Sequence, residues 1–355
     1  MLHHEIPSSN RTEVDLLAAA SSGDESAFAA LTEPVRRELH IHCYRMLGSL
    51  EDADDALQET MLRAWRQIDR FEPRAPFRAW LYRIATNVCL SALTRRDRRG
   101  EIALSVLEEA RGDAWKESEP VRLDPYPDRL LDEIFPTIRG PEATIEAEES
   151  IELAFVAAVQ MLPPRQRATL LLRDVIGYTS AEVATMLETS IAGVNSVLQR
   201  ARAAIEREQA TGWVARKHAR TNDVTEQALV RRLVDAWLTA DVAAIVSLLT
   251  EDALLTMPPQ PERYVGRDLI RTFLATVPAG GRLDQIRLVP TRANYQPAVA
   301  GYVRSDDSGP FLAHEILVLA FEGDAIASLT RFAGPDLCAR FGLPLILDGS
   351  GDLPG

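Results

Sequence analysis

Several features that mark enzymes, secreted proteins and membrane proteins are missing from this sequence. The 355 residues include only three cysteines, Cys43, Cys89 and Cys338, and their wide spacing favours a reducing compartment such as the cytoplasm. No run of about 18 apolar residues occurs, and the N-terminus lacks a signal-peptide pattern, so we expect no membrane span. No glycine-rich phosphate loop, metal motif or nucleophile elbow is present. We therefore expect a protein that is not an enzyme and that uses no metal and no cofactor.

What the sequence does contain is a basic island in an acidic chain. The net charge is −13, yet residues 61–100 hold ten arginines and only three acidic residues. A basic island in an acidic protein favours a polyanionic partner. A helix is predicted near its centre, because four apolar residues recur there at helical spacing: Phe77, Leu81, Ile84 and Val88.

The same predicted helix carries the residue types that bind single-stranded nucleic acid. Arginines neutralise phosphates, an aromatic ring stacks on an unpaired base, and an amide reads a base edge. Trp80, Arg83 and Asn87 share one face, and Arg78 lies near them in the sequence. The alternative is a solvated amphipathic helix with no ligand, which periodicity alone leaves open.

Two sequence segments resemble region 2 of the extracytoplasmic-function (ECF) sigma factors of bacterial RNA polymerase. They are DADDALQETMLRAWR at residues 52–66 and FRAWLYRIATNVCL at residues 77–90. In that family the first helix docks on core polymerase, and the second melts the minus-ten element and captures a flipped base. The resemblance implies a polymerase-binding face made of Asp54, Asp55, Gln58 and Glu59. It also implies a minus-ten-binding face made of Arg78, Trp80, Arg83 and Asn87.

The first predicted domain, residues 12–99, is followed by an acidic linker at residues 100–150. From Glu101 to Ser150 there are fourteen acidic and five basic residues, interrupted by five prolines. We expect this linker to be mostly extended or disordered. The resemblance implies that it threads toward the RNA channel of the polymerase. An inert acidic spacer is the alternative.

Residues 151–210 predict a helix-turn-helix domain. The run Thr179-Ser180-Ala181-Glu182 is a capping box that opens a short helix, and Ser190 can cap a second helix. In this motif the second helix lies in the major groove. The segment PPRQRATLLLRDVIGYTSAEVATMLETSIAGVNSVLQRAR resembles sigma region 4, which reads the minus-thirty-five element; Gly193 stands where a larger residue is usual. The predicted contacts are Asn195, Ser196, Gln199, Arg200 and Arg202.

Residues 224–344 change to an α+β pattern. A helical stretch at 224–249 and a helix at 266–274 accompany five strands, which predicts a curved antiparallel sheet. The segment ALLTMPPQPERYVGRDLIRTFL, at residues 253–274, resembles a SnoaL-like (NTF2-like) conical domain. Sigma factors of this subgroup carry such a domain in place of a separate anti-sigma protein. The resemblance therefore implies that the C-terminal domain regulates the sigma domains. The overall prediction is two all-α sigma domains followed by this α+β domain.

The resemblance implies a conical fold that encloses a pocket. The main interpretation of this domain is a packing and docking surface for the sigma domains, and two alternatives stay open. One is a small-molecule ligand of the C-terminal domain. The other is an isomerase- or cyclase-like enzyme fused to DNA-binding helices, with His314 as a base near Asp252 or Glu315. The predicted partners are core RNA polymerase and promoter DNA. The residues predicted to face the pocket are Trp237, Met257, Tyr264, Tyr295, His314 and Arg331.

Overall fold

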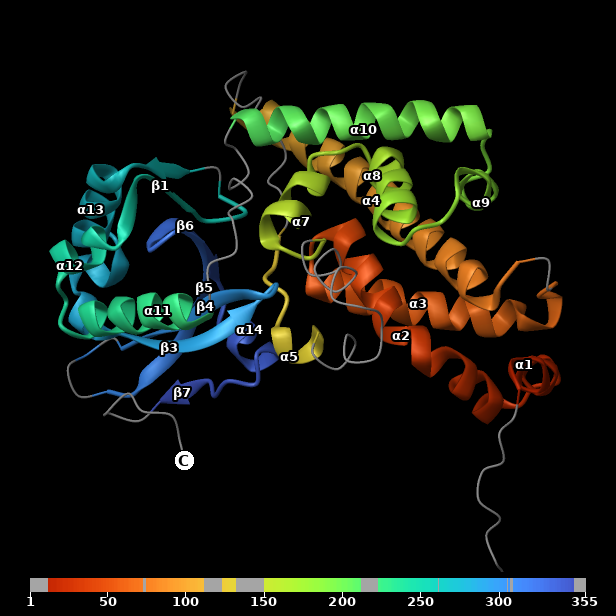
Figure 1. Ribbon diagram of the computed structural model, residues 1–355, viewed down its shortest axis with the longest axis horizontal. Helices are drawn as coiled ribbons and strands as arrows, with labels where there is room; N and C mark the ends of the chain where they lie inside the picture. Colours follow the sequence, from red (N-terminus) through yellow and green to blue (C-terminus); the bar gives the residue numbers. More distant parts are fainter. Residues whose placement is uncertain are drawn as a thin grey trace, which may run out of the picture. The chain divides into compact units, whose positions relative to one another are not determined.

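The computed structural model (Figure 1) describes residues 12–72, 75–111, 123–131, 150–211, 223–260, 262–304, 306 and 309–347. The chain forms two compact units. The first contains Met1–Trp115 and Pro164–Leu198, and the second contains Lys116–Pro163 and Gln199–Gly355. No helix within the described ranges has the length and apolar character that a membrane span requires.

The N-terminal helices of the first unit begin at polar caps. Thr12 and Asp15 form a capping box, Asp24 caps the second helix, and Ser49 caps the third. Gly48 ends the second helix with a positive φ of 78°. The elements are α1 (Glu13–Ser21), α2 (Glu25–Leu47), α3 (Leu50–Gln67), a 3₁₀ turn (Ile68–Arg70) and α4 (Phe77–Arg111).

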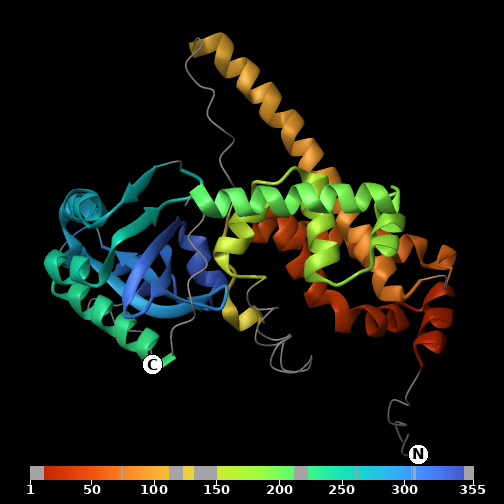
Figure 2. The same ribbon diagram turned by 45° about the horizontal axis from the view of Figure 1, so that its top comes forward.

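Helix α4 buries the stripe that the sequence predicts and packs against α2 and α3. Phe77, Leu81, Ile84 and Val88 are each at most 8% exposed, so this prediction is confirmed. The helix does not end near Arg96 but continues to Arg111, as Figure 2 shows. The prediction of an extended linker is wrong for residues 101–111. A single glycine in a helix costs only about 1 kcal/mol, and the Leu-, Glu- and Ala-rich residues after Gly100 favour helix.

The remainder of the first unit is the predicted helix-turn-helix. Its elements are α8 (Pro164–Leu170), a π-helical turn (Leu171–Val175), α9 (Ser180–Met186) and the first part of α10 (Ile191–Thr211). Thr179 and Glu182 form the predicted capping box, and hydrogen bonds from Thr179 lower the pKa of the Glu182 carboxyl. The short α7 (Leu153–Gln160), which the sequence places with the helix-turn-helix, packs in the second unit.

The second unit is a mixed sheet with helices. The strand order is β2-β1-β6-β5-β4-β3, and β7 pairs with β5. All pairs are antiparallel except β1 and β6, which are parallel, so the prediction of a purely antiparallel sheet is wrong at this pair. No hairpin joins β1 to β6, so turn geometry does not dictate their relative direction. The strands are β1 (Leu249–Thr256), β2 (Arg263–Val265), β3 (Ile286–Ala293), β4 (Gln296–Val303), β5 (Phe311–Glu322), β6 (Ala325–Ala333) and β7 (Ile346–Leu347).

The core of the second unit lies between the sheet and helices α11, α12 and α13 (Figure 1). The stretch predicted as helical to residue 249 is two helices, because Ala240 adopts a positive φ and Asp241 caps the second. Leu249 already begins β1. The helices of this unit are α5 (Asp128–Leu131), α11 (Asp223–Leu238), α12 (Val242–Ser247), α13 (Arg267–Thr276) and α14 (Pro335–Arg340), with 3₁₀ turns at Pro278–Gly281 and Leu283–Gln285.

Candidate polymerase and promoter interfaces

The predicted polymerase-binding residues lie on one exposed side of α3. Asp54, Asp55 and Gln58 are exposed, and Glu59 is half-buried in an ion pair of 2.6 Å with Arg63. Asp54 forms a contact of 3.0 Å with His40. One residue that the sequence analysis missed is Leu62, which is 44% exposed and lies one helical turn beyond Gln58 and Glu59. An exposed leucine among acidic and amide groups fits a protein partner.

The structure brings three of the four predicted minus-ten residues to one side of α4. Asn87 is exposed, whereas Trp80 and Arg83 are half-buried. The Trp80 ring lies in an aromatic cluster, with its centroid 5.2 Å from that of Phe71 and 5.5 Å from that of Phe77. This packing holds the indole in place beside the amide and the guanidinium. The face therefore presents a ring, a cation and a hydrogen-bonding amide together.

Arg78 does not belong to that face, because it pairs with Glu38 of α2, although its side chain is 40% exposed. Its Nε and Nη2 atoms donate to Glu38 Oε2 at 3.0 and 2.6 Å, and its guanidinium lies 5.0 Å from the centre of the Tyr82 ring. Burial alone would lower the pKa of Arg78, but Tyr82 and the Glu38 carboxylate outweigh it and raise the pKa. The sequence could not show this, because Glu38 lies forty residues away in α2.

The predicted minus-thirty-five residues all lie on the exposed surface of α10: Asn195, Ser196, Gln199, Arg200 and Arg202. Ser180 Oγ donates to Asn195 Oδ1 at 2.9 Å, which ties the first turn of α10 to α9. The Gly193 amide donates to Ser190 Oγ at 3.0 Å, confirming Ser190 as a cap. A Cβ at Gly193 would lie 2.9 Å from Thr189 Oγ1. A side chain at position 193 would therefore displace the hydroxyl of Thr189.

The structure brings together three of the six residues predicted to face the pocket, because Arg331 contacts both Met257 and His314. Trp237 and Met257 are less than a tenth exposed and belong to the hydrophobic core. The Tyr264 ring packs 4.7 Å from Phe273, and Tyr295 lies in the β3–β4 turn. Arg331 also forms an ion pair with Glu315.

Arg331 contacts both Glu315 and His314. Arg331 Nε donates to Glu315 Oε2, and its Nη2 lies 3.0 Å from His314 Nε2. Met257 Sδ accepts from Arg331 Nη1 at 3.8 Å. Within the described residues no group of three His, Cys, Asp or Glu side chains could hold a metal.

The structure also contains a feature that the sequence did not predict, a segment of the linker that is docked on the sheet. Residues Leu123–Leu131 lie against the β3–β4 turn, whose residues Asn294 and Tyr295 have φ values of 57° and 58°. Two positive φ values in a two-residue loop define a type I′ hairpin turn. The turn presents the Asn294 side chain, which is completely buried.

Asn294 joins two parts of the chain to the sheet. Its Oδ1 accepts from the Tyr126 amide at 2.8 Å, and its Nδ2 donates to the Ile151 carbonyl at 2.8 Å. Its own amide donates to the Tyr126 carbonyl at 2.8 Å. Beyond Ile151, the Leu153 amide donates to Gln296 Oε1 at 3.0 Å. The turn therefore holds both the linker and the start of α7.

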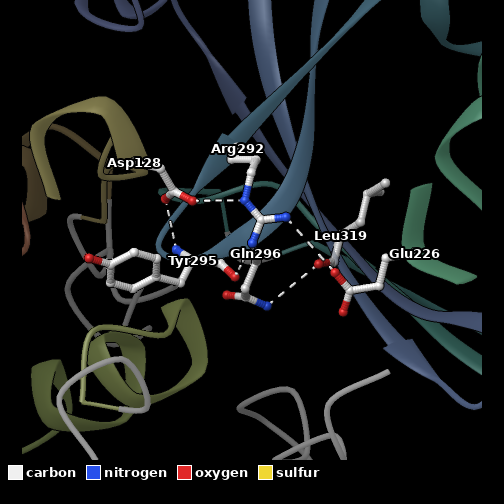
Figure 3. A network of polar contacts seen from close by, with 6 residues as sticks. All are labelled: Asp128, Glu226, Arg292, Tyr295, Gln296 and Leu319. Carbon is white, nitrogen blue, oxygen red and sulfur yellow. Dashed lines mark hydrogen bonds and ion pairs between the residues drawn. The ribbon is translucent and has the colours of Figure 1, made fainter. Parts of the chain in front are cut away.

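Asp128 makes the second attachment, which Figure 3 shows. Its Oδ2 accepts from Arg292 Nε at 3.1 Å, and its Oδ1 accepts from the Tyr295 amide at 2.8 Å. Arg292 also lies 3.9 Å from Glu226. Arg129, one residue further on, donates to the Arg340 carbonyl at 2.9 Å. The acidic linker is thus bound to the C-terminal domain by charged and backbone contacts.

These features define a class of protein. A helical bundle with an aromatic and basic face, a helix-turn-helix, and an acidic docking helix describe a promoter-binding factor of a larger transcription machine. Family models match in the same order: Sigma-70 region 2 at residues 31–99, Sigma-70, region 4 at residues 152–205, and a SnoaL-like domain at residues 230–328.

Comparison with known proteins identifies the family. The chain is 40% identical over 337 residues to the ECF RNA polymerase sigma factor SigG of Mycobacterium tuberculosis, covering 92% of this chain and 88% of that protein. It is 32% identical over 197 residues to SigM of the same organism, covering 56% and 84%. The crystal structure of M. tuberculosis SigJ matches with a TM-score of 0.56 at 23% identity, covering 89% of this chain and 99% of that one.

The chain belongs to the ECF RNA polymerase sigma factors. It binds core RNA polymerase and directs it to promoters for transcription initiation. The predicted fold, two helical sigma domains and a C-terminal SnoaL-like domain with a sheet, is confirmed.

Proposed function

We propose that this sigma factor is regulated by its own C-terminal domain, which acts by holding the acidic linker. The observation that carries this proposal is the docking of Leu123–Leu131 on the β3–β4 turn through Asn294, Asp128 and Arg292. The resemblance to the family implies that this linker threads toward the polymerase RNA channel. A linker bound to the sheet is not available for that path, so docking and threading compete.

The attachment is strong enough to affect this competition and weak enough to be reversed. Asp128 is nearly buried, and hydrogen bonds that involve a charged group contribute about 1.5 to 3 kcal/mol each. A competing site on polymerase therefore has to supply a few kcal/mol to release the segment. Binding of core polymerase is the event that offers such a site.

The full-length chain tests this proposal through Asp128 and Arg292. Replacing Arg292 with alanine removes the charged partner of Asp128, and we expect transcription from a cognate promoter by reconstituted holoenzyme to change at least threefold. Asp128→Asn should have a smaller effect, because an amide oxygen can still accept from the Tyr295 amide. Arg282→Ala, in an exposed ion pair of the same unit, is the matched control. Equal activity of all four proteins across promoters would contradict regulation through the linker.

We further propose roles for the three sequence-predicted surfaces. The exposed side of α3, with Asp54, Asp55, Gln58 and Glu59, faces core polymerase. Trp80, Arg83 and Asn87 on α4 capture the minus-ten strand. The exposed residues of α10 read the minus-thirty-five duplex, because Asn and Gln bond adenine and Arg bonds guanine or phosphate. Arg78 supports this assembly by linking α4 to α2 through its ion pair with Glu38.

Asn87 offers the most direct test of the minus-ten assignment. Asn87→Ala should lower transcription from a cognate promoter about tenfold, since a lost base contact costs roughly 1 to 3 kcal/mol. Binding to core polymerase should be unchanged. Ser91→Ala is the matched control, because Ser91 is exposed one turn further along α4 and its hydroxyl donates only to the Asn87 carbonyl. Unchanged promoter preference in the Asn87 variant would refute the assignment.

The C-terminal domain acts by binding rather than by catalysis in this proposal. The support is that Glu315, the carboxylate next to His314, is held in a largely buried ion pair with Arg331. A small molecule that binds this domain would act as a signal. The cytoplasm is the proposed location, because core polymerase acts there.

A further inference from the structure

Helix α10 begins with an apolar residue that is exposed. Ile191 is 51% exposed, whereas Val194 and Leu198 of the same helix are 1% and 7% exposed and pack inward. In a helix-turn-helix, the N-terminal residues of the second helix contact base edges in the major groove. Ile191 and Asn195 are four residues apart, so their side chains are neighbours on one side of α10. The part of α10 that should enter the groove therefore presents an apolar group beside an amide.

The amide of Asn195 is held by the other helix of the motif. Ser180, half-buried in the first turn of α9, donates from Oγ to Asn195 Oδ1 at 2.9 Å. This hydrogen bond fixes which edge of the amide carries the oxygen and which carries the nitrogen. A carbonyl oxygen accepts two hydrogen bonds and an amide nitrogen donates two, so Asn195 can still accept and donate while Ser180 holds it.

This combination of groups matches an A·T base pair. In the major groove adenine presents the N7 acceptor and the N6 amino donor, which an asparagine amide binds with two hydrogen bonds. Guanine presents acceptors at both places, so an amide whose oxygen is fixed toward the second of them is repelled. Thymine adds a methyl group that an apolar side chain can contact, and neither guanine nor cytosine has one.

We propose that Ile191 and Ser180 set the base preference of the helix-turn-helix together with Asn195. Asn195 binds an adenine, and Ile191 contacts a thymine methyl group in the same or the adjacent base pair. Ser180 is a positioning residue that acts through Asn195. This inference rests on the proposed role of α10 in reading the minus-thirty-five duplex. It adds two residues that are not among the contacts predicted from the sequence.

The test measures which duplexes the reconstituted holoenzyme binds, with the full-length chain and a DNA library randomised across the minus-thirty-five region. Sequencing of the bound fraction gives the base preference at each position. Asn195→Ala identifies the position that Asn195 reads, because the preference for adenine is lost there. Ser180→Ala should lower the same preference at least threefold and leave the other positions unchanged. A merely structural defect would instead weaken binding to all sequences alike.

Two further variants control for the hydroxyl group. Ser180→Thr keeps a hydroxyl at this position, so the preference for adenine should be retained. Thr185→Ala removes another hydroxyl from α9, an exposed one that donates to the Ala181 carbonyl at 3.1 Å, and should leave every base preference unchanged. Thermal unfolding verifies that each variant is folded.

Deoxyuridine tests the contact of Ile191, because it pairs as thymine does and lacks only the methyl group. In the duplex that the wild type binds best, deoxyuridine at one thymine should weaken binding about fourfold, the factor that corresponds to burying one methyl group. Ile191→Ala should bind the two duplexes equally. Ile191→Val, which keeps an apolar branched side chain, should still distinguish them.

Each contrary result identifies the part that is wrong. A wild-type holoenzyme without base preference in the randomised region overturns the role of α10 itself. A base other than adenine at the Asn195 position, or an unchanged profile in Asn195→Ala, overturns the reading by Asn195. If Ser180→Ala keeps the full preference for adenine, Ser180 does not position the amide. If deoxyuridine costs the wild type nothing at any thymine, Ile191 makes no methyl contact.

Discussion

Replacing Asn294 with alanine is expected to detach the linker segment from the sheet and to destabilise the C-terminal unit by about 4 kcal/mol. The side chain is completely buried and satisfies the Tyr126 amide and the Ile151 carbonyl. Alanine leaves both backbone groups buried without a partner, each at about 1 to 3 kcal/mol. It also strains the turn, since a left-handed conformation costs alanine roughly 1 to 2 kcal/mol.

Asn294→Gly separates these two causes. Glycine tolerates the φ of 57°, but it also lacks the side-chain amide. The Asn294→Gly variant should therefore lose the stability that the two hydrogen bonds contribute, without straining the turn. Thermal unfolding measures the stability of the variants. Hydrogen exchange at the backbone amides of residues 123–131 and 150–153 measures whether the linker segment is released from the sheet. An alanine variant in which these amides exchange as slowly as in the wild type would show that Asn294 does not hold the linker.

Replacing Arg331 with methionine is expected to destabilise the C-terminal unit by about 3 kcal/mol. The side chains of Glu315 and Arg331 are 11% and 23% exposed, so the variant leaves a nearly buried carboxylate without its cation. The Glu315 side chain occupies space that only glycine leaves at position 301, because a Cβ there would lie 2.7 Å from Glu315 Cγ. Glycine at position 301 is therefore part of the same arrangement.

A double-mutant cycle tests whether the loss of stability comes from leaving the buried Glu315 carboxylate without its cation. Arg331→Met with Glu315→Leu should recover most of the stability, because an apolar pair can replace a buried ion pair at little net cost. The measurement is the midpoint of chemical unfolding followed through the C-terminal unit. If the double variant is as unstable as Arg331→Met alone, packing and not the unpaired carboxylate explains the loss.

The sequence predicted well wherever the information is local. The caps at Thr179 and Ser190, the buried stripe of α4 and the exposed polar side of α10 each depend on residues within a few turns. The same holds for the acidic side of α3, where Asp55 and Gln58 are exposed as expected. The hairpin turn at Asn294-Tyr295 also carries a local signal, because asparagine tolerates a positive φ.

What the sequence missed depends on partners that are distant along the chain. Arg78 and Arg83 have the same local pattern, yet Arg78 pairs with Glu38 of α2 and Arg83 pairs with Glu188, in the turn between α9 and α10. The sequence predicted an extended linker because its composition is acidic and rich in proline. In the structure Asp128 pairs with Arg292, which lies 164 residues further along the chain.

By itself, the sequence determined the order of domains, the faces of the helices and the chemistry that each face offers, because periodicity and capping act within a few residues. Only the tertiary structure decided which of those charged groups are engaged inside the protein. The reason is that an ion pair or a buried amide depends on a three-dimensional neighbour, and no local pattern specifies one.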